Sequence, residues 1–250
     1  MAEELKPLGV LILHGFTGSH DTVRPVVPVA EQLGLPWRMP YMRGHGTRYQ
    51  DLVGVKPRDW YDDAEVALLD LLKEVKQVVV VGLSMGGLVS LNLGMHHGDR
   101  IAGLVLLTPA LRFASPLIPF TPVLKMLFTF WDNPGSFADK RLEKSACTNY
   151  AKFPTATFAR LLEYSHEVEA RLGEVKVPVT TLYSHKDTTI HPIICKLLAE
   201  TLGSKEKDFV YFDKSGHEML QDCESAAVAA AVGTAIAKHL AAVTAQPASA

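Results

Sequence analysis

One stretch of the sequence, residues 77–87, constrains the fold more than any other. Its run Val78–Leu83 is almost wholly apolar, as expected of a strand that is buried on both faces. The strand leads into Gly82-Leu83-Ser84-Met85-Gly86, which fits the nucleophile-elbow pattern Gly-x-Ser-x-Gly. The glycines avoid Cβ collisions in a sharp turn, and a mostly apolar helix, Met85–His96, follows. The stretch therefore predicts a buried strand, a strained turn that carries Ser84, and a helix.

Apolar runs and helical stretches alternate along most of the chain. The predicted strands are Leu8–Leu13, Trp37–Met42, Val78–Leu83, Ile101–Leu107, Val177–Tyr183 and Phe209–Phe212. The predicted helices are Thr22–Leu33, Trp60–Val75, Met85–His96, Pro192–Leu202 and Asp222–Ala242. Strands that alternate with helices of this length form parallel sheets. We therefore expect an α/β fold with a mostly parallel sheet of about six strands and helices on both faces.

The interval between Pro109 and Glu174 breaks this alternation. It has no convincing strand signal, and seven of the ten phenylalanines lie in it, between Phe113 and Phe158. A segment of this length without sheet signals is not a simple loop. We expect residues 111–170 to form a small helical cap over the carboxyl ends of the strands, while residues 1–110 and 171–250 form the core. The alternative is a helical insertion that packs on the flank of the core.

Composition excludes several classes of protein. The chain has 250 residues, 48% of them hydrophobic, which suffices for one well-packed domain. Its formal net charge is −2 and no basic block is present, so we expect neither a nucleic-acid partner nor binding to an anionic membrane. Three scattered cysteines without metal-ligand spacing predict free, buried thiols. The charged N-terminal sequence lacks an apolar signal core, which predicts a soluble cytoplasmic protein without stable membrane insertion.

A serine on such a turn is a candidate nucleophile, but it needs a base and an acid that orients the base. On an open parallel sheet these residues lie at the carboxyl ends of strands, where loops converge. Among the ten histidines, His217 lies in a short loop after the last predicted strand, and we predict that it is the general base. His14 and His185 also follow strands and are the competing positions.

The predicted acid is Asp187, which lies in the loop directly after the strand Val177–Tyr183. Asp213 and Asp222 are the competitors. Asp213 is too close in sequence to His217 to approach it from another strand, and Asp222 is better placed to cap the last helix. The order Ser84, Asp187, His217 is the chain order that this strand topology imposes.

Two backbone N–H groups are needed to hold the oxyanion of an acyl-transfer reaction. The Met85 N–H, directly after the nucleophile, is one candidate. The Phe16 N–H is the second, because Phe16 lies between two glycines in the loop His14-Gly15-Phe16-Thr17-Gly18 after the first strand. A phosphate-binding loop is the other interpretation of this run, but the run lacks the pattern Gly-x-Gly-x-x-Gly and a lysine-threonine pair.

Together these motifs resemble those of the α/β-hydrolase fold. The runs His-Gly-Phe-Thr-Gly, Gly-Leu-Ser-Met-Gly-Gly and Ser-Gly-His are similar to those of small bacterial thermostable carboxylesterases and monoacylglycerol lipases. The resemblance runs from about Leu8 to Leu240 and is loose across Leu111–Ala170. It implies a serine that forms an acyl-enzyme, two N–H groups that hold the oxyanion, and a small cap over the acyl pocket. These roles then fall on Ser84, Asp187, His217, Phe16 and Met85.

The expected activity is that of a serine carboxylesterase acting on short- to medium-chain carboxylic esters, with a monoacylglycerol lipase as the near alternative. The mechanism requires no metal and no organic cofactor, and the expected partner is a small apolar ester. The same triad also serves C–C bond hydrolases, perhydrolases and hydroxynitrile lyases. A ligand receptor without turnover is an alternative of a different class. Dehalogenases and epoxide hydrolases are disfavoured, because they use an aspartate where this chain has Ser84.

Large apolar residues of the predicted cap either line the acyl pocket or form the core of the cap. These residues are Leu111, Phe113, Leu117, Phe120, Met126 and Phe128. Arg43 and His45 follow the second predicted strand beside the expected mouth of the pocket, and we expect them to brace loops.

Overall fold

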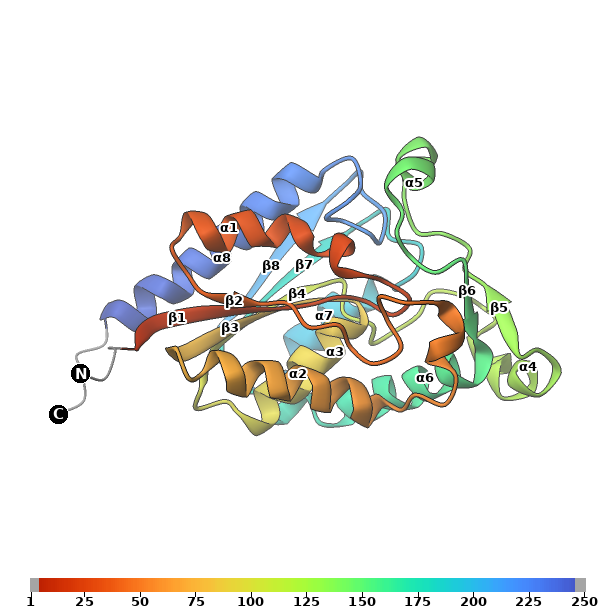
Figure 1. The fold of residues 1–250 in the computed structure, drawn as a ribbon, viewed down its shortest axis with the longest axis horizontal. Coiled ribbons are helices and arrows are strands. Elements are labelled where there is room, and N and C mark those ends of the chain that lie inside the picture. The colour runs from red at the N-terminus through yellow and green to blue at the C-terminus, as the bar shows by residue number, and fades with distance from the viewer. Residues whose placement is uncertain (1–4, 246–250) are drawn as a thin grey trace.

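The computed structural model describes residues 5–245, and its central feature is a six-stranded sheet between two layers of helices (Figure 1). The strand order is β2-β1-β3-β4-β7-β8, and every neighbouring pair is parallel. The strands are β1 (Lys6–Leu13), β2 (Trp37–Arg38), β3 (Val75–Leu83), β4 (Ile101–Leu107), β7 (Val179–Ser184) and β8 (Lys207–Phe212). The predicted α/β fold with about six strands is confirmed.

Helices cover both faces of this sheet. The helices of one face are α1 (Val27–Gln32) and α8 (Ser225–Ala245), and those of the other are α2 (Pro57–Leu71), α3 (Met85–His96) and α7 (Ile193–Thr201). Successive valines of β3 point to opposite faces: Val78 and Val80 pack in one apolar cluster, and Val79 and Val81 pack in the other. This double burial explains why the sequence of β3 is a continuous apolar run.

Some elements of the core have their predicted bounds and others differ by a few residues; α1, predicted to span Thr22–Leu33, spans only Val27–Gln32. α3 and β4 have the predicted limits, whereas β2 ends at Arg38 rather than Met42. Pro40 lies inside the predicted strand, and it has no N–H to donate to a neighbouring strand. α2 begins at Pro57 rather than Trp60, because Pro57 suits the first helical turn and the Asp59 carboxylate accepts a hydrogen bond from the Lys56 amide at 2.8 Å.

The segment between β4 and β7 lies at the end of the sheet towards which the strands run (Figure 1). It contains α4 (Thr121–Leu127), α5 (Lys140–Ala146), α6 (Thr155–Ala170) and a two-stranded antiparallel sheet of β5 (Phe130–Asp132) and β6 (Lys152–Pro154). The sequence did not predict these two strands. α6 packs against α2 and α3 as well as against α4, so it also covers the core.

Short 3-10 helices connect these elements. They are η1 (His20–Thr22), η2 (Arg24–Val26), η3 (Tyr49–Leu52), η4 (Ile118–Phe120) and η5 (Leu172–Glu174).

α8 is long and apolar enough to cross a membrane by its length and composition alone. In the structure it packs against β1, β3 and β4, and its residues Val228, Val232 and Ile236 are fully buried. We therefore assign α8 to the helical layer of the core.

The three cysteines are free, as predicted, but they are not uniformly buried. Cys195 is buried, Cys147 is half-buried and Cys223 is exposed.

Candidate active site

Ser84 occupies a strained turn between β3 and α3. Its backbone has φ = 54° and ψ = −114°, a conformation that is rare outside glycine. The turn is held by main-chain hydrogen bonds: the Ser84 N–H donates to the Leu107 carbonyl at 2.9 Å, and the Ser84 carbonyl accepts from Ala110 at 3.1 Å. Gly86 permits the close approach of β1, since a Cβ atom there would lie 2.3 Å from the Leu13 carbonyl oxygen. The sharp turn predicted from the sequence is therefore present.

Asp187 and His217 meet beside this turn from the loops after β7 and β8. The His217 Nδ1 lies 2.8 Å from the Asp187 Oδ2, and both side chains are almost completely buried. The other carboxylate oxygen accepts hydrogen bonds from the amides of Thr189 at 2.7 Å and Ile190 at 2.9 Å. With Asp187 ionised, its bond to Nδ1 requires the proton on that nitrogen and leaves Nε2 free to accept.

The surroundings of His217 favour its charged form. Burial by itself lowers the pKa of an imidazole, but the charge and hydrogen bond of Asp187 and the charge of Glu218 outweigh it, so the pKa of His217 is raised. Thr108, at the end of β4, also contacts this ring, with its Oγ1 3.2 Å from Nδ1. The sequence analysis did not identify Thr108, which in the structure is fully buried and has a positive φ of 39°.

The loop after β1 lies directly against Ser84. A Cβ atom on Gly15 would be 3.2 Å from the Ser84 Cβ, so only glycine allows this approach without a shift of the neighbouring atoms. The next residue, Phe16, has an N–H without a hydrogen-bond acceptor within residues 5–245. Met85 is the first residue of α3, where N–H groups have no acceptor within the helix. Both predicted oxyanion donors are thus on backbone that adjoins Ser84.

Two buried histidines brace this loop. The His45 Nε2 accepts a hydrogen bond from the Thr17 amide at 3.1 Å, and the His14 Nε2 accepts one from the Met42 amide at 3.1 Å. Burial lowers the pKa of His45 to about 4 and holds the pKa of His14 well below its usual value, so both rings are neutral at pH 7. The predicted bracing role of His45 is confirmed.

Arg43 fixes the loop after β2 to helix α2. It forms ion pairs with Asp59 at 2.8 Å and with Asp63 at 2.9 Å on α2, which confirms its predicted bracing role.

A cavity of about 440 Å³ opens between these core loops and the segment 111–170. Phe16, Ser84 and His217 lie on its core side. Its lining combines apolar and polar side chains. The apolar ones include Phe113, Leu117, Ile118, Leu124, Trp131, Phe153 and Phe158, and the polar ones include Asn133, Ser136, Lys140, Asn149 and Glu218.

Only some of the apolar residues that the sequence singled out face this cavity. Phe113 and Leu117 line it, whereas Leu111 is buried in the main core. Phe120, Met126 and Phe128 are 60%, 83% and 50% exposed, so they neither line the cavity nor form a cap core.

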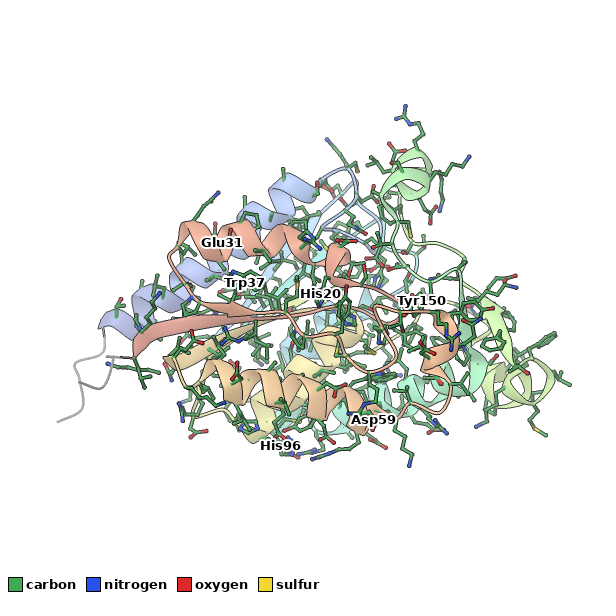
Figure 2. The ribbon with its side chains drawn as sticks, in the orientation of Figure 1. His20, Glu31, Trp37, Asp59, His96 and Tyr150 are labelled. Carbon is green, nitrogen blue, oxygen red and sulfur yellow. The ribbon has the colours of Figure 1, made fainter. Side chains whose placement is uncertain are left out.

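The segment over the cavity is tied to the core by Tyr150, which lies beside the core loops near β6 (Figure 2). Its hydroxyl accepts a hydrogen bond from the Thr47 amide at 3.0 Å and donates one to the Gly44 carbonyl at 3.1 Å. Its own amide donates to the Thr17 carbonyl at 2.9 Å, next to the Phe16 position.

The two competing acids have other positions. Asp213 is exposed at the end of β8. Asp222 does not cap α8, which begins at Ser225; its carboxylate instead accepts hydrogen bonds from the amides of Gly216 at 2.7 Å and Ala138 at 2.6 Å. Asp222 therefore joins the loop of His217 to the segment over the cavity.

A family model described as "Alpha/beta hydrolase family" matches residues 10–231 of this chain. The chain belongs to this family. Among its relatives, a thermostable monoacylglycerol lipase of Bacillus sp. (strain H-257) is 30% identical over 211 residues, which cover 84% of this chain and 83% of the relative. A carboxylesterase of Bacillus subtilis (strain 168) is 24% identical over 216 residues, which cover 86% of each chain.

The fold of this alpha/beta hydrolase is also found in solved structures. A lipolytic enzyme from the metagenome-derived pair LipS and LipT superposes with a TM-score of 0.87 at 24% identity, covering 96% of this chain and 97% of the other. At this identity the likeness is one of fold. Within residues 5–245 of the alpha/beta hydrolase, no group of three or more histidine, cysteine, aspartate or glutamate side chains is placed to hold a metal ion.

Proposed function

We propose that this alpha/beta hydrolase is a serine carboxylesterase that hydrolyses short- to medium-chain carboxylic esters through an acyl-enzyme. The observation that carries the proposal is that Ser84, on its strained turn, faces the same cavity as His217, which is bonded to Asp187 at 2.8 Å. The family and the two named relatives support an ester-hydrolysing activity.

In the proposed reaction His217 takes the proton of Ser84 through Nε2 as the serine oxygen attacks the ester carbonyl. The N–H groups of Phe16 and Met85 stabilise the negative oxygen of the tetrahedral intermediate. His217 then protonates the departing alcohol, and it activates a water molecule that releases the acid from Ser84. Asp187 holds the imidazole in the required tautomer and stabilises its charged form.

The division of the chain that we propose follows the packing of its elements. Residues 111–170 form the cap, in which residues 111–154, with α4, α5, β5 and β6, cover the cavity. α6 completes the interval; it packs against α4 and β6 of the cap and against α2 and α3 of the core, so it joins the two. The many apolar side chains that line the cavity support an uncharged aliphatic or aryl acyl group.

A monoacylglycerol lipase is the second candidate. Two observations favour it: the relative of that name is 30% identical to this chain, and polar side chains such as Asn149 and Glu218 line the cavity together with the apolar ones. Cytoplasmic location stays a prediction from the sequence.

Ser84→Ala tests the proposed nucleophile. We expect the variant to lose at least about 10³-fold in kcat on p-nitrophenyl butyrate while its circular dichroism spectrum stays native. A fluorophosphonate probe should label the wild-type protein at Ser84 and leave the variant unlabelled. Undiminished turnover by Ser84→Ala would refute the assignment, and a wild-type protein that resists the probe would favour a receptor without turnover.

A substrate panel tests the reaction class. We expect turnover of p-nitrophenyl esters to be greatest for short and medium acyl chains, across a series from acetate to palmitate. Hydrolysis of a β-diketone in preference to every ester would favour a C–C bond hydrolase, and transfer of the acyl group to hydrogen peroxide, which forms a peracid, would favour a perhydrolase.

A further inference from the structure

Thr17, the residue after the proposed oxyanion donor Phe16, has a backbone conformation that is unusual for its residue type. The turn of residues 15–18 is closed by a hydrogen bond from the Gly18 amide to the Gly15 carbonyl at 3.2 Å, so Phe16 and Thr17 are its two central residues. Thr17 has a positive φ of 65°, whereas turns with a positive φ at this position prefer glycine or asparagine. For a β-branched side chain such a φ is costly, and it persists only where neighbouring groups hold it.

Every polar group of Thr17 is held by a hydrogen bond. Its amide donates to the His45 Nε2 of the core at 3.1 Å. Its carbonyl accepts from the Tyr150 amide at 2.9 Å, and its hydroxyl accepts from the Asn133 side-chain nitrogen at 3.1 Å. Thr17 is only 3% exposed. Two of the three contacts that hold this strained residue therefore come from the cap.

Asn133 is itself oriented by its neighbours in the cap. Its side-chain nitrogen also donates to the Tyr150 carbonyl at 3.1 Å, and its side-chain oxygen accepts from the Gly135 amide at 3.4 Å. Its own amide donates to the Ala151 carbonyl at 2.8 Å. These contacts fix which end of the side chain is the nitrogen, so a donor faces Thr17. Asn133 and Tyr150 therefore contact Thr17 as one unit.

The conformation of Thr17 bears directly on the surroundings of Ser84. Gly15 packs against the Ser84 side chain, and the next N–H group, that of Phe16, has no acceptor within residues 5–245. A rotation of Thr17 to a negative φ would turn the peptide group that joins it to Phe16 and shift the rest of this four-residue turn. The Phe16 N–H would then move relative to Ser84. A misplaced donor loses much of its effect, because oxyanion stabilisation depends on preorganised geometry.

We propose that the cap positions the oxyanion donor. Asn133 and Tyr150 hold Thr17 in its strained conformation, and Thr17 in turn fixes the Phe16 N–H beside the nucleophile. Thr17 and Asn133 are positioning residues, because they act through Phe16 and not on the reacting atoms. The transition state is then fully stabilised only while the cap is seated on the core. This inference rests on the proposed ester hydrolysis and gives the cap a second role besides covering the cavity.

The first test removes the contact between Asn133 and the Thr17 hydroxyl. Asn133→Ala should lower kcat on p-nitrophenyl butyrate by about 10- to 100-fold with little change in KM, because complete loss of an oxyanion donor costs about 10²- to 10³-fold. The affinity for octyl trifluoromethyl ketone should fall by a similar factor. Ser84 adds to the carbonyl of this ketone, His217 takes the serine proton, and the negative oxygen occupies the oxyanion position.

Substitutions of Thr17 separate positioning from structural damage. Glycine adopts a positive φ without strain, so a Thr17→Gly protein should depend much less on the cap contact. We therefore expect the double variant Thr17→Gly with Asn133→Ala to have a higher kcat than Asn133→Ala alone. Thr17→Val is the matched variant, because it keeps the branched side chain and loses only the hydroxyl. Combined with Asn133→Ala it should be as slow as Asn133→Ala, since both changes remove the same hydrogen bond.

Thr148→Val is the control for the attachment of the cap. The Thr148 hydroxyl accepts a hydrogen bond from the Ser19 hydroxyl at 3.0 Å, so it links the cap to the same loop without contacting Thr17. This contact is exposed, and we expect kcat to stay within about 2-fold of the wild-type value. Circular dichroism spectra of all the variants should stay native.

Each outcome bears on the proposal. A loss in Asn133→Ala that appears in KM, with unchanged affinity for the ketone, would overturn positioning and make Asn133 a substrate contact. The absence of any recovery in the double variant with Thr17→Gly, or an equal loss in Thr148→Val, would also overturn it while ester hydrolysis by Ser84 still stood. If the wild-type protein neither hydrolysed the ester nor bound the ketone, the proposed function would fail first.

Discussion

Asp187 is the residue on which the chemistry of His217 depends most. Its carboxylate is immobilised by two backbone amides and by the imidazole, so it has no freedom to leave the ring. The chain positions of Ser84, Asp187 and His217 were predictable, because each follows a strand and parallel strands end at one edge of a sheet. Glu218 was not predicted as a cavity residue, because its partner Asn149 is 69 residues away in a segment with no regular pattern.

Asp187→Asn should lower kcat for ester hydrolysis by about 10³- to 10⁴-fold, because an amide oxygen cannot stabilise the charged imidazole as a carboxylate does. The acid limb of the pH–rate profile should also move to lower pH. In the proposed mechanism His217 acts as a neutral base, so activity falls as pH drops through its pKa. Without the Asp187 charge, only Glu218 opposes the effect of burial, so that pKa is lower.

Asp213→Asn is the matched control, since it removes an exposed carboxylate from the same edge of the sheet. Steady-state rates from pH 5 to pH 9 would check both variants. A similar loss of rate in Asp213→Asn, or an acid limb in Asp187→Asn that stays in place, would contradict the assigned role.

At the scale of elements, prediction succeeded where the residues of a single helix or strand carry a pattern long enough to define its limits. α3 and β4 are buried on nearly all sides, so their continuous apolar runs define their limits. β5 and β6 have three residues each, too few for periodicity, and they exist only because they pair with each other across the cap. The sequence also could not predict which side chains of α4 face the cavity, because the side that faces the cavity and the side that faces solvent are both apolar.

The attachment of the cap to the core can be tested at Tyr150. Tyr150→Phe removes the hydroxyl that links the Thr47 amide to the Gly44 carbonyl. We expect a loss of about 1 kcal/mol in unfolding free energy, faster proteolysis within residues 111–154, and a lower kcat/KM, since the Tyr150 amide also binds the Thr17 carbonyl next to the proposed oxyanion donor Phe16.

Tyr49→Phe is the control for that variant. It removes a hydroxyl from η3, which packs against β6 of the cap, while its ring stays against Phe130. Limited proteolysis followed by mass spectrometry would locate the cleavage sites. Equal acceleration in both variants, or cleavage in the core instead of the cap, would show that Tyr150 has no special anchoring role.

Over the whole molecule, the loops at the carboxyl edge of the sheet form one connected unit. The His217 amide donates a hydrogen bond to the Ser136 carbonyl of the cap at 2.7 Å. The Asp222 carboxylate accepts hydrogen bonds from the Gly216 amide in the His217 loop and from the Ala138 amide in the cap. His45 accepts a hydrogen bond from the Thr17 amide in the loop after β1. A change of charge on His45, His217 or Asp222 therefore affects both the stability of the fold and the geometry of the cavity.

The pH dependence of stability follows from the buried neutral histidines. The pKa of His45 is lowered to about 4, and the pKa of His14 is also well below its usual value of 6.5. Between about pH 6.5 and pH 4 the unfolded chain binds protons that the folded chain excludes, so stability falls as pH decreases. For His45 alone the loss approaches roughly 3 kcal/mol across that window. The raised pKa of His217 acts in the opposite direction, because its proton is held more tightly in the folded state.

We expect the midpoint of urea unfolding to decrease steadily from pH 7 to pH 4.5, because the lowered pKa values of His14 and His45 outweigh the raised value of His217. His45→Gln should be less stable than the wild-type protein at pH 7, since it loses aromatic packing, but its stability should depend less steeply on pH. The Gln side chain can still accept the Thr17 hydrogen bond without taking up a proton in this range. An unchanged pH slope in His45→Gln would mean that other groups govern the acid sensitivity of the fold.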